Sequence, residues 1–162
     1  MKNRKILLFV WAALILIMVA GLAGCGSSAS SFIDKEANPN INVLGIKLNM
    51  AESKVHESAG SQGEKAMCIY GYEYEYADKL INIGFKSDKG IVRRITTKNP
   101  DTTIYGIKPG TELAEAYAKI DANGFTKDDI SKYRFYKDNI ILSIISMKGT
   151  NADGVTIEIK PD

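Results

Sequence analysis

Four tyrosines at alternating positions are the most concentrated group of chemically useful side chains in this sequence. They are Tyr70, Tyr72, Tyr74 and Tyr76. Residues two apart on a β-strand share a face and lie about 6.6 Å apart, so the pattern predicts a row of four phenols. Tyrosine joins a large apolar ring to a polar hydroxyl, which is typical of residues that anchor protein–protein interfaces. The row is equally compatible with a face packed under helices, and the residues alone leave both interpretations open.

Two adjacent arginines, Arg93 and Arg94, extend this candidate binding surface. They fall on a predicted strand, where neighbouring side chains point to opposite faces. We therefore expect one of the two to join the exposed sheet surface beside the tyrosines. Lys47 and Lys108 occupy matching places in two similar segments. They are either ligands for an acidic group or exposed residues at junctions between strand and helix.

Catalytic and metal-binding motifs find little support in the sequence. The single histidine, His56, is predicted on the exposed surface of a short helix, next to Glu52 and Glu57. A nucleophile–histidine–carboxylate arrangement needs a nucleophile that no local motif supplies. Asp128-Asp129 is an ordinary pair in a turn, and no calcium-loop spacing or glycine-rich phosphate loop occurs. We expect a protein that is not an enzyme and holds no metal and no cofactor.

The amino-terminal segment carries the most specific motif of the chain. Leu22-Ala23-Gly24-Cys25 ends an apolar run that starts at Ile6 and follows the basic residues Lys2, Arg4 and Lys5. This arrangement resembles a bacterial lipoprotein signal peptide. The resemblance implies that the Cys25 thiol receives a diacylglycerol, that the chain is cut just before it, and that acyl chains such as palmitate anchor the protein in the cell membrane.

An uncleaved transmembrane anchor is the alternative for this segment. The stretch from Ile6 to Gly24 covers 19 residues, and a helix needs about 20 to cross a bilayer. No basic residue follows Cys25 closely to act as a stop-transfer flank. Both interpretations place the rest of the chain outside the cytoplasm, on the extracellular face in a single-membrane bacterium and on the periplasmic face otherwise.

Removal of residues 1–24 changes the charge and the cysteine chemistry of the protein. That segment holds three of the 21 basic residues and none of the 19 acidic ones, so the remainder carries 18 basic residues and a formal net charge of −1. The basic surface that nucleic acid requires is then missing, and no nucleic-acid partner is expected. Lipidation of Cys25 also leaves Cys68 without a disulfide partner, and its neighbours Met67 and Ile69 favour burial of the thiol.

The remaining chain divides into a linker and two similar units. Residues 25–40 hold the lipidated cysteine and a stretch rich in Ser, Ala, Asn and Gly, which predicts a flexible tether. Gly-Ile-Lys then occurs at 45–47 and again at 106–108, a spacing of 61. Two later matches follow at similar spacings: Asp78 with Asp138 at 60, and Gly90-Ile91 with Gly154-Val155 at 64. We therefore predict tandem repeats over residues 41–100 and 101–162.

Each repeat is expected to contain one short helix followed by about three strands. Asn49 and Thr111 are the predicted helix caps, and Gly60 and Gly124 end the two helices. Strand patterns cover residues 69–76, 80–85, 91–97, 133–136, 140–147 and 155–160. The fold class predicted is α+β, with the two repeats forming one continuous antiparallel sheet that has its helices on one face.

The openings of the two repeats carry a second resemblance. Gly45-Ile46-Lys47-Leu48-Asn49-Met50 and Gly106-Ile107-Lys108-Pro109-Gly110-Thr111 resemble the segment before the first helix in β-lactamase-inhibitor-like domains. The related SmpA/OmlA lipoproteins of outer-membrane assembly use one similar unit. The resemblance covers residues 41–162 and implies protein binding through a sheet face. It identifies no contact residues here, and the disulfides that are frequent in the inhibitor family are absent.

The leading functional hypothesis is a membrane-anchored module, without catalytic activity, that binds an exported protein or peptide. Inhibition of an exported hydrolase and assistance in envelope assembly are two versions of it. The first alternative is a sensor of a small ligand or of cell-wall material, with a tyrosine-lined groove between the repeats. A structural envelope lipoprotein is the second alternative. A flat exposed patch of tyrosine and arginine favours the leading hypothesis, and a closed pocket favours the sensor.

Overall fold

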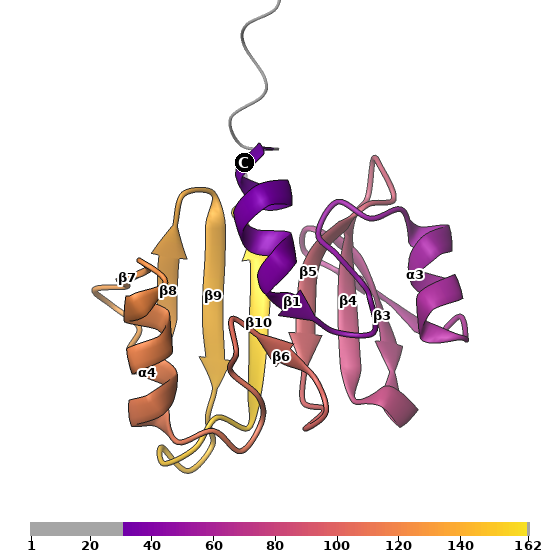
Figure 1. Ribbon diagram of the computed structural model, residues 1–162. Coiled ribbons are helices and arrows are strands. Elements are labelled where there is room, and N and C mark those ends of the chain that lie inside the picture. The colour runs from indigo at the N-terminus through magenta and orange to yellow at the C-terminus, as the bar shows by residue number, and fades with distance from the viewer. Residues whose placement is uncertain (1–30, 162) are drawn as a thin grey trace, which may run out of the picture. The chain divides into compact units, whose positions relative to one another are not determined.

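Alternation of apolar and polar residues builds the eight-stranded antiparallel sheet that dominates the fold (Figure 1). The computed structural model describes residues 31–161. The strand order is β2-β3-β4-β5-β10-β9-β8-β7, and each neighbouring pair is antiparallel. The strands are β2 (Glu64–Cys68), β3 (Gly71–Tyr76), β4 (Ile81–Lys86), β5 (Val92–Thr97), β7 (Thr126–Lys127), β8 (Arg134–Lys137), β9 (Ile140–Ile145) and β10 (Gly154–Ile159).

The helices lie in front of one face of this sheet in Figure 1, together with a small two-stranded sheet. The two-stranded sheet pairs β1 (Ile41–Asn42) with β6 (Thr103–Ile104). The helical elements are η1 (Ile33–Ala37), η2 (Asn38–Asn40), α3 (Glu52–Ala59), η3 (Ala77–Lys79) and α4 (Leu113–Ala122). The predicted α+β class with a large antiparallel sheet is confirmed. No helix in residues 31–161 is long and apolar enough to cross a membrane.

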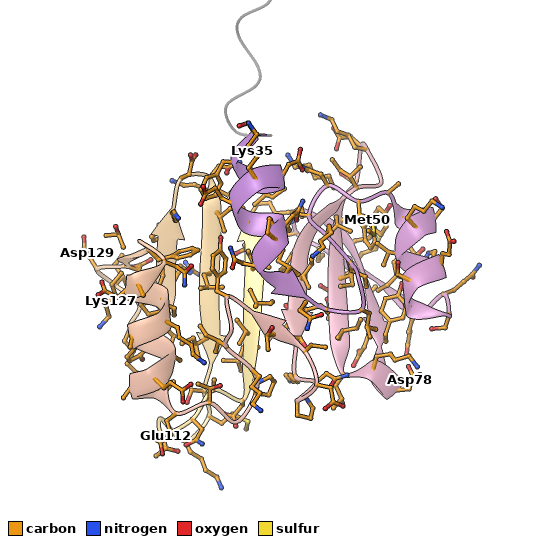
Figure 2. All side chains as sticks on the ribbon, viewed as in Figure 1. Lys35, Met50, Asp78, Glu112, Lys127 and Asp129 are labelled. Carbon is orange, nitrogen blue, oxygen red and sulfur yellow. The ribbon has the colours of Figure 1, made fainter. Side chains whose placement is uncertain are left out.

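The strand register explains where the core lies. Direct cross-strand neighbours form one row across six strands: Tyr74, Ile83, Ile95, Ile157, Leu142 and Phe135. All six are buried, because the helices cover this face, which we call the covered face. Figure 2 shows the side chains that fill the layer between sheet and helices. Burial of each large apolar side chain contributes roughly 1.5–3 kcal/mol relative to exposure, so this row is a major source of stability.

The opposite face, which we call the open face, carries the residues that alternate with that row. One row across it reads Glu73, Gly84, Arg94, Glu158, Ile141 and Tyr136. A second row reads Glu75, Asn82, Thr96, Thr156, Ser143 and Arg134. Ten of these twelve residues are polar or charged, counting Tyr136, so the sheet has an apolar side and a polar side.

Several predicted boundaries differ from the structure. Residues 33–40, predicted as flexible linker, are helical instead, and Ile33 and Ala37 are buried in the core. Their spacing of four puts both apolar side chains on one face of a helical turn. Residues 25–30 of the predicted linker, including Cys25, lie outside the described part of the chain.

The helix starts also differ from the prediction. Helix α3 begins at Glu52, and Asn49 instead takes a positive φ of 66° while its N–H donates to Val92 O at 2.8 Å. Thr111 does not cap α4, since its Oγ1 accepts from Lys108 N at 3.2 Å and closes the preceding turn. The end of α3 at Gly60 is as predicted.

The tyrosine strand starts two residues later than predicted, because Ile69 and Tyr70 form the turn between β2 and β3. Gly71 then takes a φ of +142°, and a Cβ at this position would lie 2.2 Å from Phe85 O. Only glycine fits there. Strand β2 was not predicted. It lies exposed at the edge of the sheet, and its sequence Glu-Lys-Ala-Met-Cys therefore shows no clear alternation of apolar and polar residues.

Replacement of Gly71 by alanine is therefore expected to destabilise the fold strongly. The clash with Phe85 O adds to the cost of a positive φ, and together we expect a loss of about 2–4 kcal/mol in the free energy of unfolding. Gly110→Ala is the matched control, because Gly110 also has a positive φ of 96° but nothing lies within 4 Å of its Cβ position. It should lose about 1–2 kcal/mol. Urea unfolding followed by circular dichroism measures both, and equal losses would contradict the steric argument.

Candidate functional site

Three of the four candidate tyrosines belong to the core rather than to an exposed surface. Tyr72, Tyr74 and Tyr76 are at most 9 % exposed and lie beneath α3. Tyr70 sits in the β2–β3 turn, where it is 56 % exposed. Of the two interpretations, an exposed binding surface and a face packed under helices, the structure therefore supports the second. The hydroxyl groups of this strand are directed to α3.

The hydroxyl groups converge on two side chains of α3, Glu52 and His56. Tyr74 donates to Glu52 Oε1 at 2.7 Å, and Tyr72 donates to Glu52 Oε2. The Tyr76 hydroxyl and His56 Nδ1 lie 2.8 Å apart, and His56 Nε2 lies 3.6 Å from Glu52 Oε1. Glu52 and His56 are four residues apart, which places them on the same side of the helix. We call these five residues the tyrosine cluster.

The electrostatics of the tyrosine cluster keep the carboxylate charged and the phenols neutral. Burial acts to raise the pKa of Glu52, but the hydrogen bonds from Tyr72 and Tyr74, the Lys65 cation and His56 outweigh it and lower that pKa. Burial, with the Glu52 charge, raises the pKa of Tyr72 to about 12. Lys65 Nζ stands 4.0 Å from the centre of the Tyr72 ring. The phenols are therefore hydrogen-bond donors to a carboxylate at neutral pH.

This arrangement stabilises the docking of α3 on the sheet. Tyr76, the phenol beside His56, is 1 % exposed, while the side chains of His56 and Glu52 are 20 % and 29 % exposed. His56 was predicted as a solvent-exposed residue, which is wrong: its ring packs edge-on against Tyr74 with centroids 4.6 Å apart. No local sequence pattern predicts this contact, because it depends on the distance between α3 and β3 in the fold.

The side chains of Arg93 and Arg94 both lie on the open face, whereas the sequence pattern predicted that they lie on opposite faces. The β4–β5 pairing shifts register between Gly84 and Phe85, so that Gly84 pairs with Arg94 and Phe85 with Val92. Arg93 is the extra residue of this β-bulge, which places it on the same side as its neighbour. Arg93 Nη1 lies 3.5 Å from Glu158 Oε2, while Arg94 donates to Glu73.

The two arginines differ in their accessibility. Arg93 is buried at 3 % exposure, and the Tyr70 ring covers its guanidinium at 5.0 Å. Arg94 keeps a side-chain exposure of 26 % and remains accessible on the open face. Of the six residues predicted for binding, Tyr70 and Arg94 are thus the two whose side chains reach the surface.

The remaining candidates have structural surroundings. Lys47 Nζ donates to Asn38 O at 2.7 Å and to Ile41 O, and burial lowers the pKa of this amine. Lys108 is exposed. Cys68, predicted to be buried, is half-buried on the edge strand β2, and its neighbours Met67 and Ile69 are 78 % and 93 % exposed. Within residues 31–161, no group of three His, Cys, Asp or Glu side chains could hold a metal.

Comparison with known proteins adds no relative to this description. No protein-family model, no curated protein and no solved structure matches the chain. Its function must therefore be argued from its own residues.

Replacement of Glu52 by glutamine tests the tyrosine cluster. Loss of the charged acceptor should lower the free energy of unfolding by about 1–2 kcal/mol at pH 7. The pKa of Glu52 is lowered in the folded state, so its stabilisation exists above the unfolded value near 4.5 and disappears as the pH falls through the folded value. The difference between wild type and E52Q should accordingly shrink as the pH falls below about 4.5.

Glu57→Gln on the same helix is the control for this measurement. Glu57 pairs with Lys54 at 2.8 Å, but both side chains are at least 67 % exposed, and such pairs contribute less than about 1 kcal/mol. Urea unfolding at pH 7 and at pH 3.5 compares the two variants. A cost for E57Q as large as that for E52Q would contradict the assignment.

Proposed function

We propose that this chain is a membrane-anchored module, without catalytic activity, that binds an exported protein or peptide through the open face of its sheet. The observation that carries the proposal is the polarity of that face. Two rows of polar and charged residues run across six strands, and η1, α3 and α4 pack on the other side (Figure 1). A broad rigid sheet with fixed charges favours recognition of an extended partner surface.

The charges on the open face are held in place by neighbours. Arg94 is bound to Glu73, and Arg93 to Glu158. Thr96 and Thr156 hydroxyls lie 3.0 Å apart at the junction of β5 and β10. Side chains fixed before binding lose little conformational entropy when a partner arrives, which supports a docking role. The tyrosine cluster takes no part in this proposal, since α3 covers it.

The proposal includes the tandem duplication of residues 41–100 and 101–162. The strand order supports it, because β2-β3-β4-β5 on one side of the sheet centre matches β7-β8-β9-β10 on the other. The openings match as well: Leu44-Gly45 and Tyr105-Gly106 have φ values of 50° and 73°, and of 52° and 70°. This pattern favours the resemblance to β-lactamase-inhibitor-like domains, whose sheet face binds protein.

Anchoring at Cys25 is the second part of the proposal, and it rests on the sequence Leu22-Ala23-Gly24-Cys25. Two or three acyl chains hold a protein firmly on a membrane, since each buried CH₂ contributes roughly 0.8 kcal/mol. The folded body would then stand outside the cytoplasm, within reach of exported proteins.

Substitution Cys25→Ser should abolish incorporation of labelled palmitate and leave the precursor uncut. The thiol is the acceptor of the lipid, and a hydroxyl does not replace it. Metabolic labelling and gel mobility in the native bacterium measure both effects, with Cys68→Ser as the control that keeps its label. Labelling of the Cys25→Ser variant would contradict lipidation at this residue.

A photo-crosslinking residue at Ser143 tests the binding surface. Ser143 lies half-buried on the open face, and we expect it to yield one dominant crosslinked protein in intact cells. The matched control is the same probe at Ser58, which is exposed on α3 and should yield none. Adding Arg94→Glu should remove the Ser143 product, because it repels Glu73 and reverses a charge of the surface. Equal products from both probe positions would contradict the proposal.

A further inference from the structure

A hollow of about 440 Å³ opens on the open face, where β3, β4 and β5 meet the β3–β4 loop. Asp78, labelled in Figure 2, marks this loop. The volume lies within the roughly 300–1,000 Å³ that is typical of small-ligand sites. Its principal lining side chains are Glu75, Leu80, Asn82, Arg94, Lys98 and Ile145.

Two strand glycines lie close to side chains that line the hollow. A Cβ on Gly84 would lie 3.2 Å from Arg94 Cβ and 3.4 Å from its Nε. A Cβ on Gly154 would lie 3.0 Å from Lys98 Cγ and 3.3 Å from Ile145 Cδ1. Both basic side chains therefore lie flat over bare backbone. Glycine inside a strand weakens it and often marks the close approach of a ligand or another backbone.

Opposite charges stand at two sides of the hollow. Glu75 and Lys98 are both exposed, and neither has an ion-pair partner among residues 31–161. Glu75, Asn82 and Thr96 are direct neighbours on three strands, so Glu75 and β5 are separated by two strand spacings, roughly 10 Å. Lys98 follows two residues after Thr96.

Two polar atoms at this site also lack a partner. Asn82 Oδ1 and Arg94 Nε are buried and accept or donate no hydrogen bond within the described residues. Buried polar groups in proteins are nearly always satisfied. Both atoms belong to residues that line the hollow, but they are themselves enclosed and form no part of its accessible surface.

We propose that this hollow binds a short peptide with free ends, its ammonium group at Glu75 and its carboxylate at Lys98. Three extended residues span at most about 10 Å, which covers the two strand spacings between Glu75 and β5. Lys98 lies two residues beyond Thr96, and its flexible four-carbon side chain is long enough to span that step. Leu80 and Ile145 supply apolar contacts for a central side chain. The inference rests on the proposed function, whose binding face it shares, and it names the chemical class of the ligand.

Isothermal titration calorimetry with the full chain in detergent tests this inference at pH 7 and low salt. The probe is the tripeptide Ala-Leu-Ala, used with free ends, with an acetylated amino end, and with an amidated carboxyl end. The free peptide should bind saturably, and each blocked form should bind about three- to fivefold more weakly, as expected for exposed charge pairs.

Two variants assign each end to its residue. Glu75→Gln should weaken the free peptide and remove the effect of acetylation, while Lys98→Met should remove the effect of amidation. Glu64→Gln and Lys127→Met are matched controls, because both residues are exposed and lie outside the hollow, and they should leave all three affinities unchanged.

Absence of saturable binding, equal affinity for free and blocked peptides, or equal losses in the control variants would overturn the inference. The Ser143 probe separates this result from failure of the proposed function, since Ser143 is not part of the hollow's lining. Crosslinking from Ser143 without tripeptide binding would refute the peptide site alone.

Discussion

The pairing of β5 with β10 is the contact on which the rest of the sheet depends. All other neighbours in the eight-stranded sheet follow one another along the chain, whereas Ile95 of β5 pairs with Ile157 of β10. The segment between these two residues forms a long loop, and the chain loses the entropy of closing it before the two strands gain their contacts. The pairing is continuous over four residue pairs and lies at the centre of the buried row, and it joins two four-stranded halves into one surface.

The polar groups on the two faces of this sheet have different roles. On the covered face, the tyrosine cluster satisfies hydroxyl groups that would otherwise be buried without partners, and burying such a group unpaired costs about 1–3 kcal/mol. The carboxylate of Glu52 thereby couples α3 to β3. On the open face, Arg94 pairs with Glu73 across the intervening β4, and the buried Arg93 pairs with Glu158 on the adjacent β10. The first arrangement serves stability, and the second offers fixed groups to a partner.

Much of the fold could be predicted from local patterns. Val155, Ile157 and Ile159 are buried and alternate with half-exposed Thr156 and Glu158, as the sequence predicted, because the two-residue period of a strand leaves a direct trace in the residue types. The end of α3 at Gly60 was also predictable, because helices often end at a glycine that takes a left-handed backbone conformation. The tandem repeats and the lipid anchor remain predictions.

The candidate site was harder to predict, because its geometry depends on contacts between distant segments. The Ile69–Tyr70 turn has no Asn, Asp or Gly at its centre, which are the residues that signal a hairpin. The role of His56 depends on how closely α3 packs on β3. The hollow is lined by Glu75 and Arg94 from one half of the chain and by Ile145 from the other. Single-sequence patterns carry no information on such distances.

The β-bulge at Arg93 has a consequence for how this chain can change in length. In a regular strand, insertion or deletion of one residue turns every side chain beyond it to the other face. Here Val92 pairs with Phe85 and Arg94 with Gly84, with Arg93 standing outside the ladder. Loss of that residue would leave Val92 facing the helices and Arg94 facing outward, as ordinary neighbours do. The open face can therefore gain or lose one guanidinium group at this point while the core keeps its register.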